Sequence, residues 1–219
     1  MILNKIRNQA LNSVKRNGSN LRFLSQELRN DREIVFAAVT RNGIALEFAS
    51  PELQNDSEIV IAAVKKNGLA LQFASPQLQN NREIVLAAVK KNGYALEFAS
   101  PELQNNREIV LAAVKQNINS LSYGEALQYA SQELQNDRNF ILDAVTQNGL
   151  TLHHTSPELR RDYEIVLAAI KQNINSLSYG VYPNLYNSWN NKKIYLLSRD
   201  MYNNNILNND IIKSITKFL

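Results

Sequence analysis

The chain has 219 residues, a net charge of +4, 44% hydrophobic residues and no cysteine. The missing cysteine excludes disulfides, thiolate metal sites and a cysteine nucleophile. No apolar run reaches membrane-spanning length, and residues 1–30 lack the continuous apolar stretch of a secretory signal. We therefore expect a cytoplasmic protein without redox chemistry.

Charge is distributed unevenly along the chain. Residues 1–30 hold six basic and one acidic side chain, residues 31–180 hold 13 and 17, and residues 181–219 hold five and two. A repeat protein that follows a nucleic-acid backbone is expected to carry basic residues along its whole length. Nucleic acid is therefore the less favoured partner, and binding through the basic termini is kept as an alternative.

A repeat of 25 residues dominates the sequence, as Ile34, Ile59, Ile84 and Ile109 show. After an insertion of six residues the pattern resumes at Phe140 and Ile165. Such periodicity predicts an all-α solenoid of about six two-helix repeats. We expect a degenerate capping repeat over residues 1–30, a repeat array over 31–180 with an insertion near 118–124, and a helical cap over 181–219.

The first helix of each repeat carries its own start and stop signals. An Asp or Asn precedes it and suits the N-cap position, and a Glu follows near the positive end of the helix dipole. Lysines gather in the last turn, before an Asn-Gly pair whose glycine is predicted to form a left-handed cap. The predicted N-caps are Asp31, Asp56, Asn81, Asn106, Asp137 and Asp162.

A second, shorter helix is predicted from Ile44 to Ser50 and at equivalent positions in the other repeats. Its leucine and aromatic residue, Leu46 and Phe48, are predicted to face the core. The Ser-Pro-Glu-Leu segment that follows predicts a short turn beginning at proline, with Leu53 directed inward.

The segments Arg-Glu-Ile-Val-Leu-Ala-Ala-Val-Lys, Asn-Gly and Ala-Leu-Glu-Phe-Ala-Ser-Pro-Glu-Leu make the chain resemble the bacterial domain-of-unknown-function family 4116 over about residues 12–180. The resemblance implies a helical repeat without an assigned activity, and it carries no catalytic residue to this chain. Because such repeats occur in host-associated bacteria, some in candidate secreted effectors, it also implies a host-protein partner and delivery into a host cell as the alternative location.

The segment Lys115–Gly124 recurs identically at Lys171–Gly180, where other repeats have no such loop. A segmental duplication that merely lengthens a loop explains it. The functional alternative makes Tyr123 and Tyr179 aromatic anchors for a partner.

His153 and His154 replace the Glu-Phe or Gln-Phe pair of other repeats. Adjacent helical residues point about 100 degrees apart, and no third histidine or cysteine exists, so we predict no metal site. His154 aligns with Phe48 and is expected to pack in the core, with a pH-responsive or metal-binding role as the alternative.

The column that contains His153 is predicted to be exposed and varies between repeats, as a binding surface would. No phosphate loop, catalytic triad or metal cluster appears, so we expect a non-enzymatic scaffold without a cofactor that binds a protein or peptide. A recruitment module of a larger enzyme is a further alternative, and aromatic residues among the lysines of 181–219 could stack on bases. The candidate binding residues are Glu47, Gln72, Glu97, Gln128 and His153, followed by Tyr123 and Tyr179.

Overall fold

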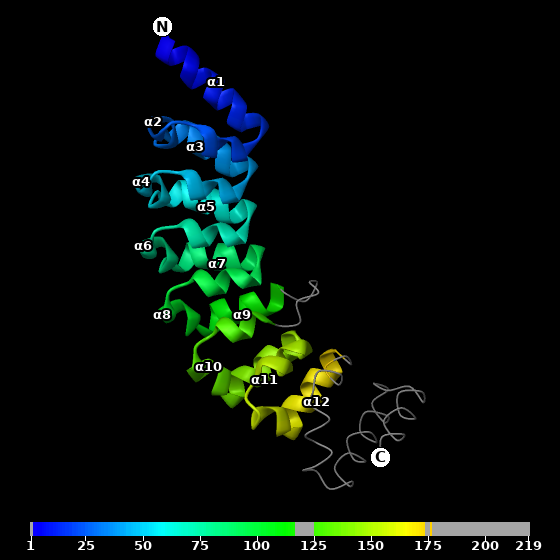
Figure 1. The fold of residues 1–219 in the computed structure, drawn as a ribbon. Helices are drawn as coiled ribbons and strands as arrows, with labels where there is room; N and C mark the ends of the chain where they lie inside the picture. Colours follow the sequence, from blue (N-terminus) through cyan, green and yellow to red (C-terminus); the bar gives the residue numbers. More distant parts are fainter. Residues whose placement is uncertain (1, 117–124, 174–175, 177–219) are drawn as a thin grey trace, which may run out of the picture. The chain divides into compact units, whose positions relative to one another are not determined.

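The computed structural model describes residues 2–116, 125–173 and 176. Two compact units divide the chain, Met1–Gln135 and Asn136–Leu219, called here unit one and unit two (Figure 1). The predicted insertion over 118–124 and the predicted cap over 181–219 both lie outside the described residues.

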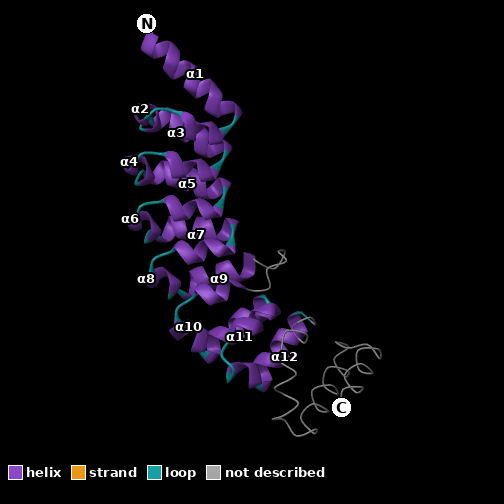
Figure 2. Ribbon diagram, in the orientation of Figure 1, coloured by secondary structure: helices purple, strands orange, loops and turns teal. Residues whose placement is uncertain are grey.

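Each repeat consists of a long α-helix, a 3₁₀ segment and a short helical turn, and no strand occurs among the described residues (Figure 2). The predicted all-α class is confirmed. No helix in the described part of the chain is long and apolar enough to cross a membrane. The long helices are α1 (Ile2–Arg16), α3 (Arg32–Arg41), α5 (Ser57–Lys66), α7 (Arg82–Lys91), α9 (Arg107–Gln116), α11 (Arg138–Gln147) and α12 (Tyr163–Gln172). The 3₁₀ segments are η1 (Gly18–Phe23), η2 (Gly43–Phe48), η3 (Gly68–Phe73), η4 (Gly93–Phe98), η6 (Glu125–Tyr129) and η7 (Gly149–His154). The short turns are α2 (Gln26–Arg29), α4 (Pro51–Gln54), α6 (Pro76–Gln79), α8 (Pro101–Gln104), α10 (Gln132–Asn136) and η8 (Leu159–Arg161).

In unit one the long helices α1, α3, α5, α7 and α9 pack in sequence, each against the next (Figure 1). Hydrogen bonds join the start of one long helix to the start of its neighbour, and the end of one to the end of the other. Arg32, at the start of α3, donates from Nε to Asp56 Oδ2, just before α5, over 3.0 Å. Arg41, at the end of α3, donates from Nε to the carbonyl of Lys15, near the end of α1, over 2.7 Å. Successive long helices are therefore parallel, and their equivalent residues form columns along the unit.

The core of unit one lies between the long helices and the 3₁₀ segments. In α5 the side chains of Ile59, Val60, Ala63 and Val64 are fully buried, and Leu71 of η3 is equally buried beneath them. The other apolar side chains of α5, Ile61 and Ala62, are only half-buried. One face of each long helix is thus in the core, and the opposite face reaches the surface.

The predicted N-caps are present. Asp56 Oδ1 accepts from the amides of Glu58 and Ile59, and Asn81 Oδ1 accepts in the same way from Glu83 and Ile84. These bonds satisfy donors that the first helical turn leaves unpaired. The replacement of Asp by Asn at Asn81 and Asn106 therefore preserves the cap while removing its charge.

The predicted left-handed glycine cap is wrong. Asn42, which ends α3, has extended dihedral angles, φ −141° and ψ 107°, and Gly43 does not have the positive φ of such a cap. The glycine serves packing instead. A β-carbon on Gly43 would lie 2.3 Å from the carbonyl oxygen of Ala63 in the next repeat. Only glycine admits this close approach between repeats.

The second element is a 3₁₀ segment rather than an α-helix, and its aromatic residue is not a core residue. Asn42 Oδ1 accepts from the amide of Ile44 and starts the segment, which ends at Phe48. Leu46 is fully buried, as predicted, but Phe48 is only half-buried. Leu46 and Phe48 lie two residues apart and point in different directions from the segment, and Phe48 stands at its C-terminal end, where its ring reaches the surface in part.

The proline turns match the prediction and also register each repeat against the one before it. Leu53, in α4, is 8% exposed and faces inward. The amide of Ser50 donates to the carbonyl of Arg29 over 3.0 Å, and its hydroxyl donates to Asn30 Oδ1 over 2.6 Å. Both bonds link neighbouring repeats. Backbone bonds of the same kind join Ser75 to Gln54, Ser100 to Gln79 and Ser131 to Gln104.

Unit two repeats the same pattern with α11, η7, η8 and α12. Phe140, Ile141, Ala144 and Val145 of α11 are fully buried. The amide of Gly149 donates to Gln172 Oε1 over 2.6 Å, which links the turn after α11 to the end of α12.

Candidate binding surface

The predicted exposed column is exposed throughout the described chain. In unit one Glu47, Gln72, Glu97 and Gln128 occupy the same position in four 3₁₀ segments, and all four are exposed. His153 is exposed at the equivalent position of η7 in unit two. The sequence therefore located this surface correctly, whereas its role in binding stays a prediction.

An aromatic side chain follows each member of this column in unit one. These side chains, half-buried, are Phe48, Phe73, Phe98 and Tyr129. Phe23, in the first repeat, is 70% exposed, and the guanidinium carbon of Arg22 lies 4.3 Å from its ring centroid. We call the surface formed by Glu47, Gln72, Glu97, Gln128 and these four half-buried aromatic side chains the 3₁₀ face.

Two tyrosines and two glutamates form a cluster on the 3₁₀ face. The rings of Tyr94 and Tyr129 meet edge to face with centroids 6.3 Å apart. The Tyr94 hydroxyl donates to Glu125, and the Tyr129 phenol is hydrogen-bonded to Glu97. Burial raises the pKa of the Tyr129 phenol, and the charge of Glu97 raises it further. Glu97 is thus partly engaged within the protein, unlike a purely solvent-facing column residue.

In unit two the paired histidines pack against one another. The rings of His153 and His154 lie edge to face, with centroids 4.9 Å apart, and His154 is half-buried. His154 therefore packs against its neighbours, as predicted, but at the margin of the core rather than fully within it. Within the described residues no group of three His, Cys, Asp or Glu could hold a metal ion.

The two predicted loop anchors, Tyr123 and Tyr179, lie outside the described residues. Their role stays a prediction.

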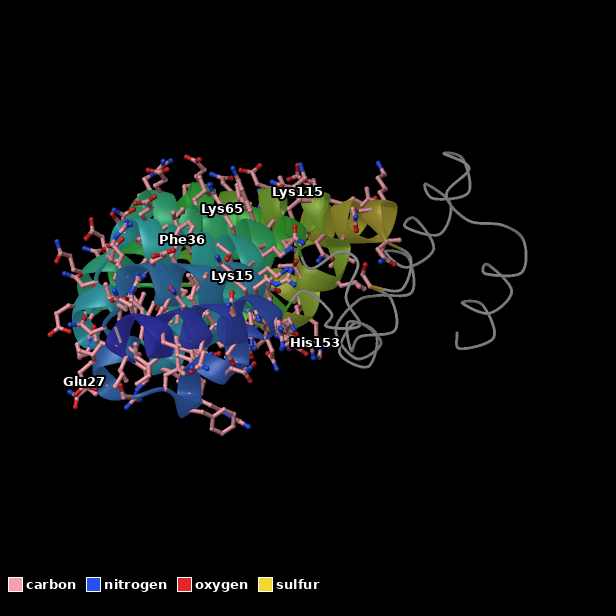
Figure 3. The ribbon with its side chains drawn as sticks, turned by 90° about the horizontal axis from the view of Figure 1, so that it is seen from above. Lys15, Glu27, Phe36, Lys65, Lys115 and His153 are labelled. Carbon is pink, nitrogen blue, oxygen red and sulfur yellow. The ribbon has the colours of Figure 1, made fainter. Side chains whose placement is uncertain are left out.

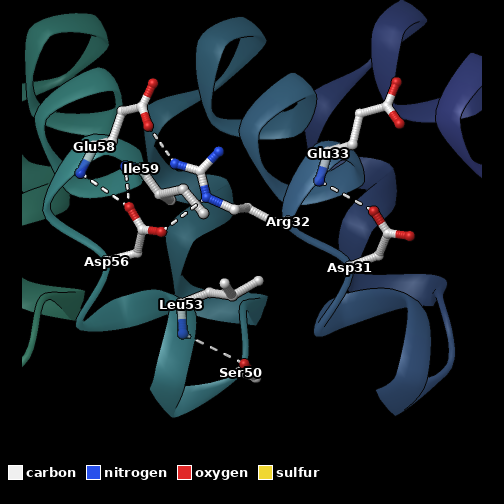
Figure 4. Close-up of polar contacts among 8 residues, drawn as sticks. All are labelled: Asp31, Arg32, Glu33, Ser50, Leu53, Asp56, Glu58 and Ile59. Atoms are coloured by element: carbon white, nitrogen blue, oxygen red, sulfur yellow. Dashed lines mark hydrogen bonds and ion pairs between the residues drawn. The ribbon is translucent and has the colours of Figure 1, made fainter.

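The long helices carry an ion-pair ladder toward their N-terminal ends, which was not predicted from the sequence. An arginine in one long helix reaches the capping aspartate and the glutamate at the start of the next, as Figure 4 shows for Arg32. Arg7 contacts Asp31 Oδ2 over 2.6 Å and Glu33 Oε2 over 2.7 Å. In unit one Arg32 pairs likewise with Asp56 and Glu58, and Arg82 pairs with Glu108. Unit two contains the same arrangement of Arg138 with Asp162 and Glu164.

These contacts shift the ionisation of the capping aspartates. The Arg7 guanidinium holds the pKa of the Asp31 carboxyl below its usual value, and Arg138 does the same for Asp162. Burial opposes ionisation of Asp56, but hydrogen bonds from the Ile59 amide and from Arg32 outweigh it and lower its pKa. An arginine that follows four of the six caps, at Arg32, Arg82, Arg107 and Arg138, was the sequence signal for this ladder.

Comparison with known proteins supports the repeat assignment. The family model described as Domain of unknown function (DUF4116) matches six overlapping segments, residues 7–54, 33–79, 56–104, 81–123, 122–160 and 138–179. These segments span most of the chain, and the chain therefore belongs to this family of helical-repeat proteins. Neither the curated proteins nor the solved structures gave a match.

Proposed function

We propose that the chain is a non-enzymatic scaffold that binds a protein or peptide ligand through the 3₁₀ face. One observation carries this proposal. The same exposed polar position recurs in four successive repeats of unit one, at Glu47, Gln72, Glu97 and Gln128, each time beside a half-buried aromatic ring. A ligand that runs along the stack meets an equivalent pair of side chains at every repeat.

The residue types suit recognition of a protein. Aromatic rings bury large apolar area and are enriched among residues that dominate binding energy. Carboxylates and amides beside them can accept or donate hydrogen bonds that fix the register of a ligand. Glu and Gln alternate along the column, so its charge differs between repeats and gives the ligand an orientation.

The cellular setting belongs to the same proposal and is supported by the family resemblance alone. The chain acts in the bacterial cytoplasm or, as the alternative, after delivery into a host cell, where it binds a host protein. A recruitment module of a larger enzyme would use the same surface.

The test is affinity capture from bacterial and host lysates, with nuclease and high-salt arms, read by mass spectrometry. We expect one protein to remain bound after both treatments. Capture that disappears with nuclease would support the alternative, in which the basic termini bind nucleic acid.

A matched pair of variants identifies the surface that binds. Glu47→Ala, Gln72→Ala and Glu97→Ala together should lower retention of the captured protein at least tenfold. The control, Glu52→Ala, Gln77→Ala and Glu102→Ala, removes the same residue types from exposed positions of the short turns. If only Tyr123→Ala with Tyr179→Ala abolished retention, the 3₁₀ face would not be the site.

A further inference from the structure

The last turns of the long helices in unit one form a continuous basic edge. Because these helices are parallel, their C-terminal ends lie along the same side of the unit, opposite the ends that the short turns α2, α4, α6 and α8 precede (Figure 1). Eight basic side chains, all exposed, occupy these ends: Lys15, Arg16, Arg41, Lys65, Lys66, Lys90, Lys91 and Lys115. Figure 3 labels Lys15, Lys65 and Lys115, from α1, α5 and α9.

Charge is separated along each long helix. The ion pairs of unit one in which Arg7, Arg32 and Arg82 meet carboxylates lie in the N-terminal halves of the long helices. Within the described residues, no carboxylate pairs with any of the eight basic side chains of the opposite edge. Arg41 donates only to the carbonyl of Lys15, so its charge also lacks a carboxylate counter-ion there. The net charge of +4 does not reveal that, among the described residues, ion-paired and unpaired basic side chains lie toward opposite ends of the long helices.

Favourable interaction with the helix dipole stabilises basic residues in a last turn. The helices α1, α5 and α7 each carry a pair there. Like charges along one exposed edge create a positive potential that attracts anions. The edge therefore suits an anionic ligand.

The surface beside the basic edge is apolar. Ile61, Leu86 and Leu111 are half-buried, and each lies four residues before a lysine of the edge, on the same side of its helix. Glu58, Glu83 and Glu108 lie a further three residues back, about 10 Å along the helix from the lysines. A ligand on the basic edge that is wider than about 10 Å would therefore also lie over the glutamates. Apolar groups on a narrower ligand would be buried against Ile61, Leu86 and Leu111.

These dimensions favour a peptide over nucleic acid. A DNA duplex, whose major groove alone is about 12 Å wide, would bring phosphates over the glutamate column. Single-stranded nucleic acid binds by stacking on aromatic rings. Along this apolar column Phe36 is aromatic, whereas Ile61, Leu86 and Leu111 are not.

A second copy of the chain fits poorly. Its opposite edge carries six carboxylates, at Asp31, Glu33, Asp56, Glu58, Glu83 and Glu108, among four arginines, at Arg7, Arg32, Arg82 and Arg107. Most of that charge is already neutralised, so it cannot balance eight unpaired cations.

Resting on the proposed function, we propose that the basic edge of unit one binds an extended acidic peptide segment of the partner protein. Stacked helices lie about 10 Å apart, which equals about three residues of extended chain. The matching segment carries Asp or Glu at every third residue, with apolar residues between them that contact Ile61, Leu86 and Leu111.

The test uses fluorescence anisotropy with the full chain and a labelled peptide of repeated Glu-Leu-Ser, about 12 residues long. We expect its Kd to rise at least tenfold between about 50 and 200 mM salt. Two control peptides are needed, one with Gln for every Glu and one of identical composition with all Glu at one end. Both should bind at least tenfold more weakly.

Matched variants locate the contact. Lys65→Gln with Lys90→Gln should weaken binding of the Glu-Leu-Ser peptide at least fivefold. Lys5→Gln with Arg22→Gln removes the same charge from exposed positions away from the edge and should change the Kd less than twofold. Circular dichroism confirms that each variant folds. Equal binding by both variants would overturn the proposal, as would tighter binding of a thymidine oligonucleotide or a DNA duplex of matched length.

Failure here is separable from failure of the scaffold function. If the captured protein stays bound to the Lys65→Gln, Lys90→Gln variant but is lost from the 3₁₀-face variant, the scaffold stands and the acidic segment is wrong. If no protein is captured at all, the scaffold function itself fails.

Discussion

A β-carbon on Gly43 would lie 2.3 Å from the carbonyl oxygen of Ala63, one repeat further along the chain. The same distance separates such an atom on Gly18 from Ala38, and 2.4 Å separates it on Gly68 from Ala88. Each obstacle is a backbone atom of a buried helix, which cannot rotate away. The glycine column therefore fixes how closely successive repeats stack.

Gly43→Ala is expected to lower the free energy of unfolding by about 1–3 kcal/mol or more, because the added methyl must separate two repeats. Urea unfolding followed by circular dichroism measures the change. Ser57→Thr is the control, since it adds a methyl group at an exposed position. A Gly43→Ala variant as stable as this control would show that the spacing between repeats can increase without loss of unfolding free energy.

Asp56→Ala is expected to lower the unfolding free energy by about 1 kcal/mol, because the amides of Glu58 and Ile59 lose their acceptor. Asp56→Asn should cost less, since Asn81 already provides the same cap in the next repeat. Thermal unfolding of both variants separates the cap from the charge. Equal losses would mean that the Arg32 ion pair, not the cap, is the stabilising feature.

Stability is expected to fall in acid because of the capping aspartates. The folded pKa of Asp31, Asp56 and Asp162 is lowered, so their contribution is complete above the unfolded pKa of about 3.9. It is lost as the pH falls below that value through the lowered folded pKa. Urea unfolding across this range should show a smaller decline for Asp31→Asn than for the unaltered chain; parallel profiles would contradict the linkage.

Ser57 interrupts the arginine ladder, because Arg32 and Arg82 occupy the equivalent positions on either side. Ser57→Arg is expected to stabilise unit one by about 0.2–1 kcal/mol through pairing with Glu83, and high salt should reduce the gain. The measurement is urea unfolding at two salt concentrations. With Glu83→Gln in the background the gain should vanish; its persistence would exclude this ion pair as the cause.

Leu71 and Phe73 differ in burial although both are large and apolar, since Leu71 is fully buried and Phe73 is half-buried. Leu71→Ala should cost about 2–5 kcal/mol, and Phe73→Ala distinctly less despite removing more atoms. Denaturant unfolding compares the two. A larger loss of unfolding free energy from Phe73→Ala than from Leu71→Ala would show that the aromatic column belongs to the core, and it would weaken the case for the 3₁₀ face.

Local signals predicted much of the fold correctly. The 25-residue period, the Asp and Asn caps and the proline turns depend on neighbouring residues, so they are readable from the chain. The exposure of Glu47, Gln72, Glu97 and Gln128 was predicted from the variation within their column. The aromatic column was misplaced, because recurrence in every repeat does not reveal in which direction the side chain points from its segment.

Contacts between repeats were beyond such local reasoning. The sequence shows Asn-Gly after α1, α3, α5, α7 and α11, but only the packed structure shows that the carbonyl of Ala63 excludes a β-carbon at Gly43. It also shows that Arg32 forms an ion pair with Asp56 of the next repeat, whereas Lys65 and Lys90 pair with no carboxylate among the described residues. The period and the caps can be read directly along the chain. The basic edge, in contrast, exists only because parallel stacking brings the C-terminal ends of equivalent helices together.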